Sequence, residues 1–260
     1  MKKIIMSTLF LTSALLSDVS ITDVEEKYTK NSTPITATAV PEQSIDLGFA
    51  HTSGNTKTLN LNAKYTFKHT MNNGNYEPFK YNFQLTGFLN QDNGTKTAEE
   101  YTALLNGEQA LPSNWLAYIE LGWLRNEFTN YDNKFSLVMG VGKIIIDDGK
   151  HRLVVKIGPS YNIEQFSNGQ KEASFGSLNE YLEYSNKLNK FSNLYFKVGA
   201  MENFEDMGTD YEATALLGFN FVLSENMHLN IEEELNYNNL PATGFKKTDI
   251  KSIISVGYKF

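Results

Sequence analysis

The sequence contains no cysteine among its 260 residues. No disulfide framework can therefore hold the fold together, and no lipid can be attached through a cysteine after the apolar run near the start. Beyond that run, no stretch approaches the roughly 20 apolar residues of a transmembrane helix. With a mean hydropathy of −0.37, these absences exclude a bundle of membrane-spanning helices.

The residue patterns of common catalytic and metal sites are also missing. The four histidines lie at spacings that match no metal site, and we place them at strand ends or turns: His51, His69, His151 and His228. No His lies in mid-strand on an apolar face beside a Ser, as the nucleophilic pair of an outer-membrane phospholipase would require. No glycine-rich phosphate loop leads from a strand into a helix. We therefore expect no enzyme, no cofactor, no metal and no nucleic-acid partner.

What is present begins with an export signal. Met1, Lys2 and Lys3 precede a short apolar run over residues 4–16. A basic start followed by such a run is typical of a secretory signal peptide, so we assign residues 1–17 to one, with Sec-type export. Residues 18–43 are polar and lack periodicity. We expect a flexible periplasmic lead-in there, and a short partner-binding segment is the alternative.

From residue 44 to residue 260 the chain alternates between apolar and polar residues. Such a period of two is typical of β-strands. In the clearest segment Leu61, Ala63 and Tyr65 alternate with Asn62 and Lys64. Twelve segments follow this pattern, over residues 44–52, 58–69, 79–91, 99–110, 115–128, 135–146, 152–166, 175–185, 191–201, 211–223, 228–237 and 250–260. The fourth and eighth are weak, so ten or fourteen strands are the alternatives.

Tight turns alternate with longer connections between these segments, and aromatic residues gather near the segment ends. This arrangement is typical of outer-membrane barrels, which have short periplasmic turns and longer outer loops. The connection over residues 70–78 departs from it, because a long loop is expected there in place of a turn. The sequence predicts an all-β fold: a transmembrane antiparallel up-and-down β-barrel of about twelve strands, closed by the C-terminal strand. A soluble β-sandwich would alternate as well.

One residue fits the pattern badly. Glu233 shares the parity of Leu229, Ile231 and Leu235, which would direct a carboxylate toward lipid. A charge on the lipid-facing side is costly. We therefore expect either a β-bulge that shifts the register or a wrongly assigned face.

Two short motifs carry a resemblance to a known family. The first hairpin contains Thr52-Ser53-Gly54-Asn55-Thr56, and the chain ends in Val256-Gly257-Tyr258-Lys259-Phe260. These motifs resemble the YdiY-like salt-induced outer-membrane proteins, a family of unknown function numbered 481. The resemblance implies an outer-membrane barrel linked to salt or osmotic stress. A Tyr two positions before a terminal Phe also resembles the end of bacterial outer-membrane barrels in general, which implies that Tyr258 and Phe260 serve as the barrel-closing and assembly signal. The family resemblance brings no catalytic or binding residues.

The polar parity of the strands carries charges that we expect to line a lumen. These are Lys64, Lys68, Lys80, Glu100, Glu108, Glu120, Arg152, Lys156, Glu232, Glu234, Lys251 and Lys259. They either pair across strands and fill a narrow interior, or form opposed charged walls of a small pore.

The function we expect is a narrow passive channel for small solutes, or an envelope protein linked to salt or osmotic stress. A non-conducting structural barrel and, less favoured, a lipid-modifying enzyme are the alternatives. The location would be the outer membrane of a Gram-negative-type bacterium. The partners would be outer-membrane lipid and, through the C-terminal strand, the barrel assembly machinery, with the protein itself a monomer.

Overall fold

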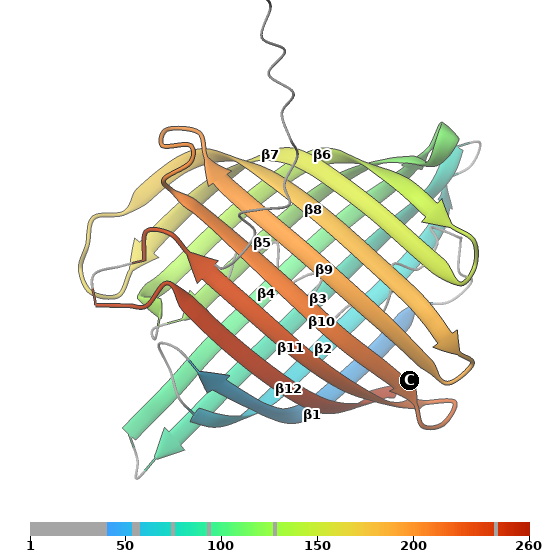
Figure 1. Cartoon of the computed structure of the whole chain (residues 1–260), viewed down its shortest axis with the longest axis horizontal. Coiled ribbons are helices and arrows are strands. Elements are labelled where there is room, and N and C mark those ends of the chain that lie inside the picture. Colours follow the sequence, from blue (N-terminus) through green and yellow to red (C-terminus); the bar gives the residue numbers. More distant parts are fainter. Residues whose placement is uncertain (1–40, 54–57, 74–75, 93–94, 127–128, 242–243) are drawn as a thin grey trace, which may run out of the picture.

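The computed structural model describes residues 41–53, 58–73, 76–92, 95–126, 129–241 and 244–260. The predicted signal peptide, most of the predicted lead-in and the Gly54-Asn55 turn lie outside the described residues. The described chain forms one closed barrel of antiparallel strands (Figure 1). The strands are β1 (Glu42–Ser53), β2 (Thr58–Asn73), β3 (Tyr76–Asp92), β4 (Thr95–Leu111), β5 (Trp115–Asn126), β6 (Tyr131–Asp147), β7 (His151–Phe166), β8 (Ala173–Asn189), β9 (Ser192–Asn203), β10 (Tyr211–Val222), β11 (Met227–Asn238) and β12 (Thr248–Lys259).

Each strand pairs with the strands before and after it in the sequence, and β12 pairs with β1 to close the ring. The closing register runs from Ser44 opposite Lys259 to Ser53 opposite Ile250. Closure leaves no strand edge unpaired, which a sheet in lipid requires. The prediction of an all-β barrel sealed by its C-terminal strand is confirmed, including the weak fourth and eighth segments.

The two ends of the barrel differ. At one end, called the turn end here, short connections join the strands: η1 (Pro112–Asn114) and residues 148–150, 190–191 and 223–226. The C-terminus lies at this end (Figure 1). At the other, the loop end, lie the longer connections over residues 167–172, 204–210 and 239–247. None of the helices in the described residues is long and apolar enough to cross a membrane.

The prediction of a long loop over residues 70–78 is wrong. β2 continues to Asn73 and β3 begins at Tyr76, with an irregularity in the pairing between Met71 and Asn73. Met71 pairs with Phe79, so backbone pairing continues through a stretch whose Asn, Gly and Pro residues suggested a loop. Tertiary pairing has overridden local turn propensity, and this connection obeys the same rule as its neighbours.

The burial pattern is inverted relative to a soluble protein. On β2, Leu61 is 65% exposed while the adjacent Asn62 is 7% exposed. Apolar side chains from all around the ring face outward in the same way, among them Phe49, Phe135 and Ile254. A water-soluble sandwich would bury these side chains. An apolar belt outside and a polar interior are typical of a barrel in lipid.

Two glycines bring the paired backbones of β6 and β7 close together. A Cβ at Gly140 would lie 2.3 Å from the Ile157 carbonyl oxygen and 2.6 Å from the Tyr118 ring, and a Cβ at Gly158 would lie 2.7 Å from the Gly140 Cα. A strand glycine at position 140 therefore allows a close approach of the two backbones.

Glu233 faces outward in a regular strand. The pairings of β11 with β10 and with β12 contain no register shift. The expectation of a bulge or a misassigned face is therefore wrong. The Ser252 hydroxyl on β12 donates a hydrogen bond to Glu233 Oε2 at 2.5 Å, which gives the exposed carboxylate one partner on the outer wall.

Candidate functional site

The lumen is the candidate site, and its inward side chains come from every strand of the barrel. Of the charged residues that the sequence analysis places there, eight are buried: Lys64, Glu100, Glu108, Glu120, Arg152, Glu232, Glu234 and Lys251. Lys68, Lys80, Lys156 and Lys259 are partly exposed. The structure does not bring these residues into one cluster, because they are spread from the turn end to the loop end.

Some of these charges pair with a neighbouring strand. Lys80 Nζ lies 2.5 Å from Glu108 Oε2, across the β3–β4 pair. Lys64 Nζ lies 3.8 Å from Asp46 Oδ2, across β1–β2. Such pairs resemble ordinary cross-strand ion pairs within a sheet and tie together only strands that are already hydrogen-bonded.

Two further predicted charges pair near the turn end. Arg152 Nε lies 3.2 Å from Asp147 Oδ2, within the β6–β7 hairpin. Lys259 Nζ lies 3.7 Å from Glu42 Oε2 where β12 meets β1, and both side chains are more than a third exposed. An exposed ion pair of this kind adds little stability.

Other pairs cross the lumen between strands that are not neighbours. Lys251 on β12 donates to both carboxylate oxygens of Glu100 on β4, at 3.0 and 2.7 Å. Lys156 on β7 donates to Glu108 Oε1 on β4 at 2.6 Å. Because β4 borders only β3 and β5, each of these side chains spans the interior.

A third crossing lies at the loop end. Lys134 on β6 donates to both oxygens of Glu212 on β10, at 2.9 and 3.0 Å, and lies 2.8 Å from Glu164 Oε1 on β7. The Lys134 side chain is only 1% exposed. Two carboxylates therefore compensate one buried ammonium group, as a charge out of water requires. The three contacts from Lys134, Lys156 and Lys251 are called the cross-lumen ion pairs below.

Several further charges also face inward that were not predicted from the sequence, including Asp46, Lys134, Glu183, Lys197 and Glu212. All five are buried. Alternation identifies most of them: Asp46 lies between Ile45 and Leu47, and Lys197 lies between Phe196 and Val198. Lys134 precedes the predicted start of its strand, because β6 begins at Tyr131 rather than at residue 135.

Part of the interior is apolar. Leu116, Tyr118, Val138, Val154 and Tyr181 form a buried cluster on β5 to β8. The sequence predicts charged residues along the lumen, and on this side the interior is instead packed with apolar side chains like a protein core. Close-packed apolar side chains leave no room for water, so this side of the barrel is closed by packing rather than by charge.

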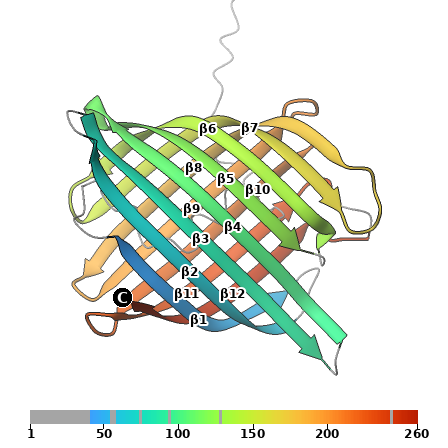
Figure 2. The same ribbon diagram turned by 180° about the vertical axis from the view of Figure 1, so that it is seen from behind.

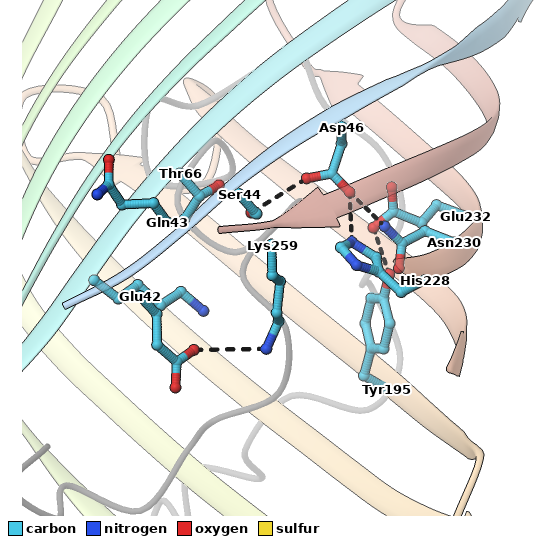
Figure 3. A pocket seen from close by; sticks show the side chains of 11 residues that line it. Glu42, Gln43, Ser44, Asp46, Thr66, Tyr195, His228, Asn230, Glu232 and Lys259 are labelled. Carbon is cyan, nitrogen blue, oxygen red and sulfur yellow. Dashed lines mark hydrogen bonds and ion pairs between the residues drawn. The ribbon is translucent and has the colours of Figure 1, made fainter. Parts of the chain in front are cut away.

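A small polar cavity lies at the turn end (Figure 3). Its volume is about 30 Å³, which is room for about one or two water molecules. Asp46 Oδ1 accepts hydrogen bonds from His228 Nε2 at 2.6 Å and from Asn230 Nδ2 at 3.1 Å. Beside His228 the Tyr195 hydroxyl donates to Glu232 Oε1 (Figure 3). Tyr195 comes from β9 and Glu232 from β11, so the cavity is lined by one arc of strands that runs from β9 through β12 to β2.

Three atoms of the cavity wall lack partners in the described part of the chain. They are Thr66 Oγ1, His228 Nδ1 and Glu232 Oε2, and all three side chains are buried. Leaving a buried polar atom unsatisfied costs about 1–3 kcal/mol. The cavity is therefore suited to hold water or a small polar group.

The four histidines lie on four different strands, β1, β2, β7 and β11. Within the described residues, no group of three or more His, Cys, Asp or Glu side chains could hold a metal ion. His69 lies inside β2 rather than at its end, because the strand is longer than predicted, and its Nδ1 lies 3.2 Å from the Tyr81 hydroxyl. His51, near the loop end of β1, is the register partner of Ser252, a juxtaposition the sequence analysis did not foresee.

The fold and lumen define a closed twelve-stranded barrel of the outer-membrane type. The family model described as "Protein of unknown function, DUF481" matches residues 45–260. The chain belongs to this family, as the resemblance at its two ends indicated. A comparison with curated proteins finds no match.

Solved structures share the fold at low sequence identity. The COG4313 outer membrane channel from Pseudomonas putida F1 has a TM-score of 0.57 at 10% identity, over 89% of this chain and 100% of that one. The NanC porin has a TM-score of 0.55 at 9% identity, over 83% and 100%. Outer membrane phospholipase A from Escherichia coli has a TM-score of 0.51 at 10% identity, over 83% and 95%. Enzymes and channels share this barrel, so the likeness establishes the fold alone.

Proposed function

We propose that this protein is an outer-membrane barrel whose lumen is closed at rest, so that it acts as an envelope barrel with little or no basal conductance. The apolar outer wall supports a location in lipid, and the short turns support a periplasmic turn end. The observation that carries the proposal is the set of cross-lumen ion pairs from Lys134, Lys156 and Lys251.

Burial in the middle of the lumen supports closure. A water-filled passage would leave the side chains along its wall accessible to water. Glu234, Gln84 and Asn106 are each 0% exposed although they face the interior. Ions crossing at this level would have to separate the pairs and displace packed side chains.

A narrow passive channel for small solutes is the second candidate. The cavity at the turn end favours it, because Thr66, His228 and Glu232 present polar atoms without partners in the described chain. Such a wall is suited to small polar solutes. On this candidate the resting structure is a closed state, and separation of the cross-lumen ion pairs opens it.

Three further parts of the proposal concern the envelope. The side chains of Tyr258, near the end of β12, and Phe260, the C-terminal residue, are exposed. The barrel assembly machinery would bind them there. The barrel would act as a monomer, because closure leaves no strand edge to pair with another copy. A role in salt or osmotic stress follows only from the family resemblance.

Single-channel recording in planar bilayers tests closure. Wild-type protein should insert without steady conductance steps. A triple variant with Lys134→Ala, Lys156→Ala and Lys251→Ala removes the three side chains that cross the lumen and should produce steps. Lys259→Ala is the matched control, because it removes a lysine whose pair lies at the rim. Steady steps from the wild-type protein would contradict closure and favour the passive channel.

Folding of each variant can be checked separately by heat-modifiable migration on a gel. A variant that fails to fold does not count for either candidate, and Lys156→Met, which retains volume in the lumen, then replaces it. The Lys156→Met variant should give small steps, because only one of the three crossings is removed. A Lys156→Met variant without conductance steps, together with a conducting wild-type protein, would reject the proposal.

A further inference from the structure

An apolar groove lies on the outer wall, away from the lumen. It crosses β3 to β7, which are adjacent in the ring and lie side by side in Figure 2. Its volume is about 330 Å³, which is far more than the roughly 30 Å³ share of a water molecule in the liquid. The groove is therefore large enough for part of a long apolar chain.

Register explains why the wall is hollowed there. Ala103 faces outward on β4 and pairs with Trp123 on β5, and the neighbouring outward positions carry larger side chains such as Phe83 and Leu105. A short side chain among long ones leaves a depression. Phe135 and Tyr161 line the groove farther along, on β6 and β7.

A polar border follows the groove toward the loop end. The Trp123 indole N–H donates to Asn133 Oδ1 at 3.0 Å, and Asn133 Nδ2 donates to Gln165 Oε1 at 3.1 Å. Arg125, two residues beyond Trp123, lies 3.6 Å from Asp132, with side chains 38% and 47% exposed. An exposed pair at this distance contributes little energy, and it places a guanidinium beside the polar border of the groove.

We propose that this groove binds one acyl chain of lipid A, the phosphorylated glycolipid of the outer leaflet, with a phosphate of its headgroup at Arg125. The proposal rests on the outer-membrane location proposed above. The apolar lining matches the chain, and the guanidinium matches the phosphate, which Arg binds through two parallel hydrogen bonds. An aromatic residue at the boundary between the two suits the membrane interface.

The chain's two tryptophans supply a built-in comparison. Trp123 lines the groove, whereas Trp115 lies at the turn end of the same strand, with Lys143 Nζ 4.8 Å from its ring centroid. Trp115→Phe leaves Trp123 as the only reporter, and Trp123→Phe leaves Trp115. In vesicles of phosphatidylcholine with brominated acyl chains, a tryptophan in contact with lipid is quenched.

Addition of lipid A to these vesicles tests the site. Lipid A should displace the brominated lipid from the groove, so Trp123 fluorescence should recover several-fold more than the mole fraction of lipid A predicts. Trp115 should recover only in proportion to the mole fraction. The preference for lipid A is the ratio of the observed recovery to the recovery that its mole fraction predicts. Arg125→Gln should reduce this ratio at Trp123 to near one, and Ala103→Phe should abolish the preference by filling the groove. Ala215→Phe on β10 is the control for an added outward ring.

Equal recovery at both tryptophans would overturn the proposal, because it would show a wall covered by lipid without preference. A preference that survives Arg125→Gln would overturn the phosphate contact and with it the choice of lipid A. An absence of quenching at both tryptophans would instead reject the location in lipid on which the proposed function depends. The two failures are therefore distinguishable.

Discussion

Some buried charges within the lumen are shared between two partners of opposite sign. Glu108 accepts from Lys156 across the lumen and lies beside Lys80 on the adjacent strand. A charge removed from water is strongly destabilising once its partner is lost, although the complete pair adds little over an apolar equivalent. Single substitutions in these clusters should therefore have unequal effects.

Glu108→Ala should lower the free energy of unfolding by about 3–5 kcal/mol, because it leaves two lysines without their shared carboxylate. Lys156→Met should cost clearly less, since Glu108 retains Lys80 at 2.5 Å. Denaturant titrations in liposomes measure both. Equal losses for the two variants would show that Glu108 does not act as a shared partner.

Gly257 is a second residue whose identity the lumen dictates. A Cβ there would lie 2.2 Å from Asp46 Oδ1 and 2.2 Å from His228 Nε2. Gly257→Ala should therefore separate this pair and destabilise the barrel by about 1–3 kcal/mol. Gly87→Ala is the matched control, because its Cβ would meet Tyr101 at an ordinary 3.5 Å. Similar stability of the two variants in the same titration would contradict the close approach.

The outward carboxylate of Glu233 should carry a cost instead. A charge facing lipid destabilises a barrel by about 2–4 kcal/mol for Lys or Arg at the midplane, and by less for Glu. Glu233→Leu should therefore raise the free energy of unfolding in liposomes by up to about 2 kcal/mol, less the value of the Ser252 hydrogen bond. Glu225→Leu, in the exposed turn, should not do so. A destabilised Glu233→Leu variant would indicate that the carboxylate has a structural role.

At the scale of elements, the tight turns fix which strands become neighbours. In the β6–β7 turn Asp148 Oδ1 accepts from the backbone N–H of Lys150 at 2.9 Å and of His151 at 2.6 Å. These backbone donors hold the pKa of the Asp148 carboxyl below its usual value. The folded hairpin therefore favours the ionised form of the Asp148 carboxyl.

The pH dependence of this turn follows from the sign of the shift. A lowered pKa means that the stabilisation is present above the unfolded value and is lost as the pH falls through the folded one. NMR titration should place the pKa of the Asp148 carboxyl below that of an Asp side chain in an unstructured peptide. Asp148→Ala should speed amide exchange at Lys150 and His151. An Asp148 carboxyl whose pKa is equal to or higher than that of Asp in an unstructured peptide would contradict these hydrogen bonds.

Alternation predicted the strands and the inward parity of residues such as Lys64 and Glu234 without any structure. It could not predict which walls meet, because Lys156 and Glu108 are brought together only by ring closure over three strand spacings. It also misjudged residues 70–78, where local turn residues concealed continued pairing. The apolar cluster around Tyr118 was missed for the same reason, since its members come from four strands.

At the scale of the whole molecule, an apolar exterior and a charged interior combine into a barrel that we propose is closed to water at its middle. The cross-lumen ion pairs tie β4 to β7 and β12, and β6 to β10, in addition to the ring of backbone hydrogen bonds. Closure of the lumen is the central claim, since both the proposed resting state and its opening depend on it.

Thiol labelling of single-cysteine variants in liposomes tests closure most directly, because the chain contains no cysteine of its own. Ser177→Cys and Ser255→Cys place a thiol of nearly the same size inside the lumen, where the serines are 0% and 3% exposed. Ser224→Cys and Ser167→Cys place one at an exposed turn and loop. A closed lumen predicts that a small charged thiol reagent modifies the two interior cysteines at least about a hundredfold more slowly than the exposed ones, by analogy with protection of buried groups. Comparable rates at all four positions would show an open, water-filled passage and contradict the account.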